Sequence, residues 1–352
     1  MADSPAPEPS PGATTTHQRR PRYRGKNPRR FQEKYKEHDP ARYPDAIAKV
    51  LASGKTPAGS HRPIMVREVL EVLAPRPGEI AVDCTLGYGG HAREIISRLL
   101  PGGHLFGLDA DPIELPKTEE RLRALGFGPD IFSAHRTNFA GLPRILLQSG
   151  HRVADMILVD LGASSMQLDD PARGFSLKQE GPLDMRMNPR RGQSASALIQ
   201  KTSPEELAGL FLEYADEPNA GPLAAALSGK DLNTTSSLAL AIRRALPRLT
   251  EDERDLAVRR VFQALRIAVN DEFSALEMLL RQLPDCLKPG GRVSILTFHS
   301  GEDRRVKKAF QEGTREGWYA DVAREVIRAS AEERHANPRS ASAKLRWARR
   351  AD

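Results

Sequence analysis

The amino-acid sequence predicts an α/β protein with an open, mostly parallel sheet and a small helical unit inserted into it. Short apolar runs that end in aspartate alternate with segments of helical periodicity over 61–165, and this alternation resumes after residue 256. Between 166 and 255 a long polar loop and several helical segments replace it. We therefore expect a core formed by 61–165 and 256–352 and an inserted helical domain formed by 166–255.

The expected strands are short apolar runs, and the expected helices carry apolar residues at spacings of three and four. Strands are predicted at 80–84, 104–109, 130–134, 155–161 and 292–298, with candidate final strands at 322–329 and 342–347. Helices are predicted at 66–73, 92–100, 115–125, within 195–248, as one long helix at 255–283, and at 304–311. The third and fourth strands therefore follow each other with no helix assigned between them.

A glycine turn joins the first expected strand to the helix that follows it, in the sequence IAVDCTLGYGGH at 80–91. Asp83 ends the strand, and Gly87, Gly89 and Gly90 come after it. Glycine permits tight turns and lets the backbone approach a ligand closely. A strand, glycine turn and helix of this kind form a nucleotide crevice at the carboxyl edge of an open α/β sheet.

Three expected strands end in a carboxylate, at Asp83, Asp109 and Asp160. Asp109 lies 22 residues after Gly87, where an acid on the second strand accepts the hydroxyls of a ribose. A dinucleotide site uses G-x-G-x-x-G to seat a pyrophosphate, whereas this chain has G-x-G-G, and Asp83 would repel phosphate. S-adenosyl-L-methionine has a ribose, a sulfonium and an ammonium but no phosphate. The pattern thus favours a methyltransferase over the alternative, a nicotinamide-dependent dehydrogenase.

The composition favours a cytoplasmic globular protein without a membrane partner. No apolar run in the 352 residues approaches the roughly 20 that cross a bilayer, and the N-terminus lacks the apolar region of a signal peptide. Cys84 and Cys286 have neither disulfide-framework nor zinc-ligand spacing, so no metal site is expected. Cys84 lies in the proposed site, but a small packed thiol is favoured over a nucleophile.

Most of the net charge of +7 lies near the N-terminus. Residues 1–60 contain 12 basic and 6 acidic residues, and nine of the basic ones fall between Arg19 and Lys36. Their surroundings are rich in proline and polar residues and lack apolar periodicity, which predicts a disordered extension. Such an arm could hold the phosphate backbone of RNA, or it could equally be a solvated tail.

From about residue 61 to its end, the chain resembles the small-subunit ribosomal RNA methyltransferase H family, also called the MraW family. The resemblance is carried by short motifs: DxTxGxGGH at 83–91, DxDP at 109–112, DLGxSSxQLDD at 160–170, RGFS at 173–176, GPLDMRM at 181–187, FQALRIAVNDE at 262–272, PGGR at 289–292, FHS at 298–300, EDR at 302–304, NPRS at 337–340 and AKLR at 343–346. The chain departs from the family pattern at Tyr88, where an arginine is usual, at Met166 in place of a proline, and at Gly301 in place of a leucine.

The resemblance implies a Rossmann-like S-adenosylmethionine-dependent methyltransferase sheet with an inserted helical domain for substrate recognition. It implies methyl transfer to N4 of a cytidine in the decoding region of 16S rRNA, within the small ribosomal subunit. The family's cofactor contacts fall here on Gly89, Gly90, His91, Asp109, Phe139, Asp160 and Gln167. From the residue pattern alone Phe139 could equally be a core residue, and the resemblance favours contact with adenine. The alternative is a divergent RNA-binding paralogue with weak or different methylation activity.

An exocyclic amine is a poor nucleophile because its lone pair is delocalised into the ring, so the enzyme has to orient it and accept a hydrogen bond from it. Asp160 ends the fourth strand beside the expected methyl position. We predict that Asp160, Ser164 and Ser165 carry out this step. Asp160 could instead only bind the cofactor.

Further side chains have two interpretations each. Phe175 and Phe298 could stack on a base removed from its helix, although core packing is favoured for both. His299 and Ser300 could line the pocket for the base or pack the fifth strand. The polar loop offers three charged residues that could hold the substrate strand or pair with one another, namely Asp184, Arg186 and Arg190.

Overall fold

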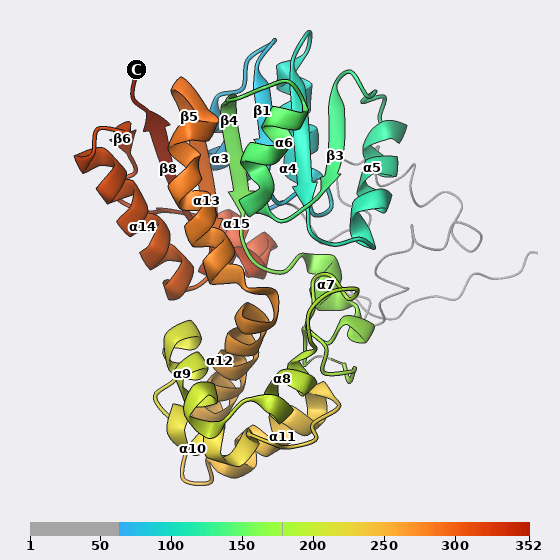
Figure 1. Ribbon diagram of the computed structural model, residues 1–352, viewed down its shortest axis with the longest axis vertical. Helices are drawn as coiled ribbons and strands as arrows, with labels where there is room; N and C mark the ends of the chain where they lie inside the picture. The colour runs from blue at the N-terminus through green and yellow to red at the C-terminus, as the bar shows by residue number, and fades with distance from the viewer. Residues whose placement is uncertain (1–62, 178) are drawn as a thin grey trace, which may run out of the picture.

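Residues 63–177 and 179–352 are described by the structure, which is a computed structural model (Figure 1). The basic extension predicted at 1–60 lies outside the described residues. Among the described helices, none combines the length and apolar character that a membrane span requires.

Within the described residues, eight strands form one sheet in the order β3-β2-β1-β4-β5-β8-β6, with β7 paired to β8. The strands are β1 (Ile80–Asp83), β2 (His104–Asp109), β3 (Phe132–Arg136), β4 (Ala154–Asp160), β5 (Leu287–Thr297), β6 (Tyr319–Val322), β7 (Ile327–Arg328) and β8 (Lys344–Arg350). β1 to β5 pair in parallel, and β8 runs antiparallel to β5. The aspartates that end β1, β2 and β4 therefore meet at one edge of the sheet.

Helices cover both faces of this sheet (Figure 1). One apolar core joins one face to α6 (Leu142–Gln148), α13 (Glu272–Cys286) and α14 (Ser300–Arg315). A second core joins the other face to α3 (Val66–Leu73), α4 (Gly90–Leu99) and α5 (Glu114–Ala124). Neighbouring residues of β1 alternate between the two, since Ala81 packs in the second and Val82 in the first. Burial on both faces explains why the strands are continuous apolar runs.

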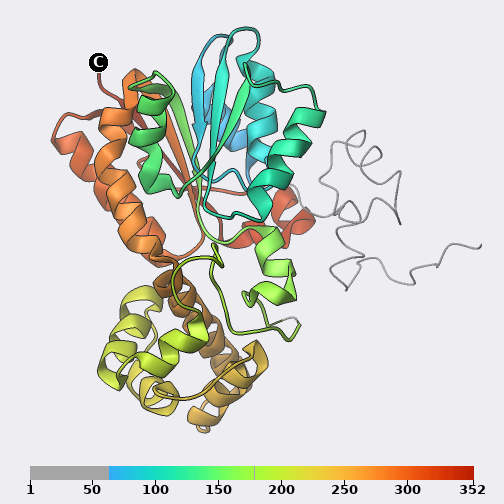
Figure 2. The same ribbon diagram turned by 45° about the vertical axis from the view of Figure 1, so that its right-hand side comes forward.

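A separate helical unit lies beyond the carboxyl edge of the sheet (Figures 1 and 2). Its helices are α8 (Ala195–Lys201), α9 (Pro204–Ala215), α10 (Ala220–Leu227), α11 (Thr235–Ala245) and α12 (Glu251–Asn270). They share an apolar core of their own. Ser203 and Thr250 begin α9 and α12 with reciprocal hydrogen bonds to glutamates three residues on, which satisfies backbone donors at both helix starts.

The single helix predicted at 255–283 is wrong, because the structure has α12 and α13 with a break at Asp271. Asp271 has a φ of 51°, a left-handed conformation that aspartate adopts more readily than most residues. No glycine or proline marks this break, so the apolar periodicity continues through it. Because α12 packs in the core of the helical unit, that unit extends to about residue 270, beyond the predicted limit of 255.

Three other intervals differ from the prediction. α6 lies between β3 and β4, where no helix was assigned. The candidate strand at 322–329 is two short strands, β6 and β7, and both pair with β8. α15 (Ala331–Ala336) was also not predicted, and the segment after it runs back towards the carboxyl edge of the sheet to reach β8.

Candidate functional site

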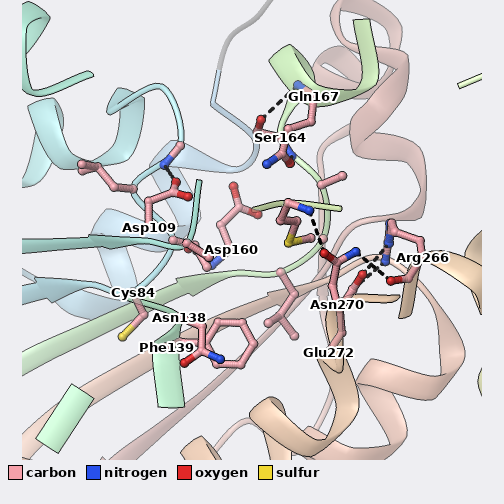
Figure 3. Close-up of a pocket in the computed structure, with 18 of the residues that line it drawn as sticks. Cys84, Asp109, Asn138, Phe139, Asp160, Ser164, Gln167, Arg266, Asn270 and Glu272 are labelled. Atoms are coloured by element: carbon pink, nitrogen blue, oxygen red, sulfur yellow. Dashed lines mark hydrogen bonds and ion pairs between the residues drawn. The ribbon is translucent and has the colours of Figure 1, made fainter. Parts of the chain in front are cut away.

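A cavity of about 1190 Å³ lies at the carboxyl edge of the sheet, between the sheet and the helical unit. Its walls are formed by the glycine turn after β1, the ends of β2 and β4, the junction of α12 with α13, and residues 338–342. Figure 3 shows Asp109, Asp160 and Phe139 on the sheet side and Arg266, Asn270 and Glu272 on the side of that junction.

The glycine turn adopts left-handed backbone at Gly87 (φ 51°) and Gly89 (φ 82°). The amide of Gly87 donates to Asp109 Oδ2 at 2.8 Å, which fixes the turn to the end of β2. Gly87 and Gly90 line the cavity. Gly89 faces α5 instead, where an added Cβ would lie 3.0 Å from Thr118 Cγ2. Gly89 does not line the cavity, whereas its neighbours Tyr88 and Gly90 do.

The three strand-end carboxylates are buried together with little compensating charge. Burial raises the pKa of Asp83 and of Asp109 to about 6 each. Burial, followed by the nearby charge of Glu302, raises the pKa of Asp160 to about 7. A raised carboxylate pKa means that the ionised form is disfavoured by its surroundings, and a cation from outside would reverse this. The edge is therefore suited to a positively charged ligand.

Asp160 has one carboxylate oxygen without a partner. Its backbone amide donates to Thr85 Oγ1 at 2.6 Å, which holds the end of β4 against the glycine turn. Oδ2 lies 3.8 Å from His91 Nδ1, whereas Oδ1 is buried and has no hydrogen-bond partner among the described residues. Burying an acceptor without a hydrogen bond costs free energy. Oδ1 therefore marks a position where a ligand can donate a hydrogen bond.

His91 is the second predicted residue beside this carboxylate. Its Nε2 lies 2.9 Å from the carbonyl oxygen of Ile64, which sets Nε2 as the protonated nitrogen of a neutral ring. Burial lowers the pKa of His91, so the ring is neutral near pH 7. Its Nδ1 faces Asp160, and His91 lines the cavity.

Ser164 and Gln167 begin α7 (Ser165–Asp169) and bond to each other. Ser164 Oγ accepts from the amide of Gln167, and Gln167 Oε1 accepts from the amide of Ser164 at 2.9 Å. Gln167 Nε2 also donates to Asp111 Oδ2 at 2.9 Å. These bonds leave the hydroxyl hydrogen of Ser164 and one amide hydrogen of Gln167 for an outside partner. Both residues, and Ser165, line the cavity.

Of the three aromatic candidates, two line the cavity and one lies in a core. Phe139 begins the short helix η2 (Phe139–Gly141), packs partly against the sheet core and also lines the cavity, so its position is compatible with both interpretations. Phe298 does the same from the end of β5. Phe175 is only 8% exposed in the core of the helical unit and is absent from the cavity walls. For Phe175 the core interpretation is therefore the one that the structure shows.

Of the three charged candidates in the polar loop, two pair with each other and one lines the cavity. Arg186 binds Asp184 through two nitrogens, at 2.8 and 2.7 Å, so these two residues pair with each other. Arg190 is exposed and lines the cavity. Arg191, which was not predicted, lines the cavity beside it.

His299 and Ser300 lie at the end of β5, and Ser300 is exposed. His299 Nε2 is 3.1 Å from Glu302 Oε1, and Ser300 Oγ donates to Asp216 Oδ2 of the helical unit at 3.0 Å. Neither residue lines the cavity. Of the two interpretations, packing at the end of β5 fits their positions.

Four cavity residues near the α12–α13 junction were not predicted. Arg266 binds Glu272 through Nε and Nη2 at 2.9 and 3.0 Å, and Glu302 lies 3.9 Å from Nη2. Asn270 accepts from the amide of Met187 and donates to the carbonyl of Met185. All four line the cavity and belong to motifs quoted above: Arg266, Asn270 and Glu272 flank the break at Asp271, and Glu302 reaches the cavity from α14.

Cys84 lines the cavity but has only 2% of its surface exposed. Burial raises the pKa of its thiol well above the usual range. The protonated form prevails, which agrees with a packed thiol and argues against a nucleophile.

Comparisons with known proteins identify the family to which the chain belongs. One relative, the ribosomal RNA small subunit methyltransferase H 2 of Alkaliphilus metalliredigens, is 52% identical over 340 residues, which cover 94% of this chain and 97% of that relative. The ribosomal RNA small subunit methyltransferase H 1 of Lachnoclostridium phytofermentans is 47% identical over 350 residues, with 97% and 95% covered. The profile of the MraW methylase family matches residues 58–351, so the methyltransferase fold is confirmed and the chain belongs to this family.

Proposed function

We propose that this protein transfers the methyl group of S-adenosyl-L-methionine to N4 of a cytidine in 16S rRNA of the small ribosomal subunit. The relatives are named as small-subunit ribosomal RNA methyltransferases, which supports rRNA as the substrate class. The choice of cytidine N4 and of the decoding region follows from the family resemblance.

The residues at the sheet edge fit S-adenosylmethionine. Asp109 already accepts from the amides of Gly87 and Asp111, and its remaining lone pairs suit the hydroxyls of a ribose. Asp160 and the other buried carboxylates suit a sulfonium and an ammonium, and would repel a pyrophosphate. Phe139 supplies an aromatic wall for adenine. These residues, with Gly90, His91 and Gln167, would hold the cofactor, which supplies an electrophilic methyl carbon.

The observation that carries the proposal is the unpartnered Oδ1 of Asp160. An amine that attacks a methyl carbon gains positive charge and has to lose a proton. Oδ1 can accept a hydrogen bond from the N4 amine as this charge develops and can then take the proton. Ser164 and Ser165, at the start of the next helix, would orient the base beside it. The helical unit on the opposite wall would bind the RNA strand around the target.

Methyl incorporation from labelled S-adenosylmethionine into small subunits from a strain that lacks the gene tests the proposal. The product should be a cytidine methylated at N4, found by mass mapping of rRNA fragments. Subunits that bind the protein without gaining a methyl group would support the RNA-binding paralogue instead. A methyl group on another atom or another base would contradict the assignment of cytidine N4.

A further inference from the structure

Arg266 has one nitrogen that the protein leaves free. Glu272 binds the guanidinium side-on through Nε and Nη2, and Glu302 approaches Nη2. Nη1 has no hydrogen-bond partner among the described residues. Two carboxylates thus fix the plane of the guanidinium, and its remaining N–H donors are available to the cavity that Arg266 lines.

The free nitrogen faces the backbone next to Asp160. A Cβ built on Gly162 would lie 3.8 Å from Arg266 Nη1 and 3.8 Å from Phe298 Cδ2. Gly162 has a φ of 95° and presents no side chain, so the space between the arginine and the phenylalanine ring stays open. Asp160, whose Oδ1 lacks a partner, lies two residues earlier. Arg266 and Phe298 therefore meet at Gly162, and both line the same cavity as Asp160.

This set matches one kind of nucleobase edge. Cytosine presents an amino N–H donor beside a ring nitrogen acceptor, and adenine presents the same pair. Uracil and guanine present the reverse, a carbonyl acceptor beside a ring N–H. A carboxylate and a guanidinium side by side can bind the edge of cytosine or adenine. Against uracil or guanine, the carboxylate would face a carbonyl acceptor and the guanidinium would face an N–H donor.

We propose that Arg266 Nη1 and Asp160 Oδ1 together read the amino edge of the target base, with Asp160 accepting from the amine and Arg266 donating to the adjacent ring nitrogen. Phe298 borders the base, and Gly162 leaves room for it. This inference rests on the proposed function and adds Arg266 as the residue that distinguishes cytosine from uracil. A matched polar pair of this kind is worth about a ten- to hundredfold preference.

Binding of cytidine and uridine 5′-monophosphates to the protein saturated with S-adenosylhomocysteine tests the proposal without methyl transfer. Ligand-detected NMR titrations should give at least about a tenfold preference for the cytidine nucleotide. Arg266→Gln should abolish that preference and leave the affinity for S-adenosylhomocysteine unchanged. Arg281→Gln, at an exposed arginine on α13 outside the cavity, should retain the preference.

Glu272→Gln provides a second variant in case Arg266→Gln does not fold, since it keeps the arginine but weakens its anchor. It should reduce the preference several-fold. Equal or absent binding of the two nucleotides by the wild-type protein, or an intact preference in Arg266→Gln, would overturn the inference. Such a result, with methyl transfer to cytidine N4 still observed on small subunits, would leave the proposed function standing, whereas failure of transfer by the wild-type protein would overturn the proposed function itself.

Discussion

Arg173 Nη1 lies 2.8 Å from Asp111 Oδ2, and this ion pair is almost fully buried, with side-chain exposures of 8% and 1%. It joins the loop after β2 to the polar loop after β4. Asp111 Oδ1 accepts from the amide of Ile113, and Arg173 Nη2 donates to the carbonyls of Arg186 and Met187. One pair therefore organises two loops around the cavity, and neither residue lines it.

Arg173→Ala should lower the free energy of unfolding by about 3–5 kcal/mol, because it leaves the Asp111 carboxylate buried without its counter-charge. Urea-induced unfolding measures the loss. The double variant Arg173→Met/Asp111→Asn removes both charges and keeps an acceptor for Ile113, so it should be more stable than Arg173→Ala. A double variant less stable than the single one would show that the pair is not the source of the effect.

Asp109→Ala should weaken binding of S-adenosylmethionine by about 1–3 kcal/mol, since it removes the proposed acceptor of the ribose hydroxyls. Isothermal titration calorimetry measures the affinity. The variant also frees the amides of Gly87 and Asp111. Asp109→Asn, which keeps one carbonyl acceptor, serves as the control and should lose less affinity. Unchanged affinity in Asp109→Ala would contradict this part of the site.

The sequence is sufficient to predict the parts of this molecule that depend on local pattern. The apolar runs predict the sheet, because a strand buried on both faces has to be apolar throughout. The glycine turn and the strand-end aspartates predict which edge of the sheet carries the site. The break at Asp271 could not be predicted, since an aspartate enters the left-handed region without any sequence marker. Arg266 was missed for the same reason: its contacts with Glu272 and Glu302 exist only after the chain turns there.

Gly89 and Phe175 show the other limit of sequence reasoning. A glycine in a binding motif can serve the turn and face a neighbouring helix, and an aromatic residue in a polar loop can fill a core. In both cases the type of residue fits the predicted role. Whether the residue faces the cavity depends on the direction of the backbone, which the sequence does not reveal.

Asp160→Asn should stabilise the free protein at pH 8. The pKa of Asp160 in the folded state is about 7, above its ordinary value of 3.8, so the stability it contributes when protonated is lost as pH rises towards 7. The neutral amide avoids this loss. Thermal unfolding should therefore give a higher Tm for the variant at pH 8 and a smaller difference at pH 5. Binding of S-adenosylmethionine should weaken in the same variant. If the variant and the wild-type protein had the same Tm at both pH values, the raised pKa of Asp160 would be contradicted.

Asn270→Ala should destabilise the protein by about 1–3 kcal/mol, because it leaves the amide of Met187 and the carbonyl of Met185 without partners. The loop at 185–187 would lose its anchor to α12, so KM for the RNA substrate should rise while the affinity for S-adenosylmethionine stays the same. Gln263→Ala is a matched control on the same helix, since its amide binds the carbonyl of Tyr214 outside the cavity. It should leave KM for the RNA unchanged.

Four arginines line the cavity with exposed side chains and form no ion pair within the described residues: Arg136, Arg144, Arg190 and Arg191. Unpaired cations at the edge of a site for RNA are suited to phosphate contacts. Each such contact releases counterions and contributes about 0.7–0.9 to the slope of log affinity against log salt concentration.

The double variant Arg190→Ala/Arg191→Ala should therefore reduce this slope by about 1.4–1.8 and weaken RNA binding most at low salt. Filter binding of small-subunit rRNA across a series of salt concentrations measures the slope. The control Arg281→Ala/Arg315→Ala removes two exposed arginines from α13 and α14, outside the cavity walls. If the control reduced the slope as much as the test variant, the effect would come from net charge. A reduction confined to the test variant would place phosphates beside the polar loop, because counterion release counts only the contacts that the RNA makes.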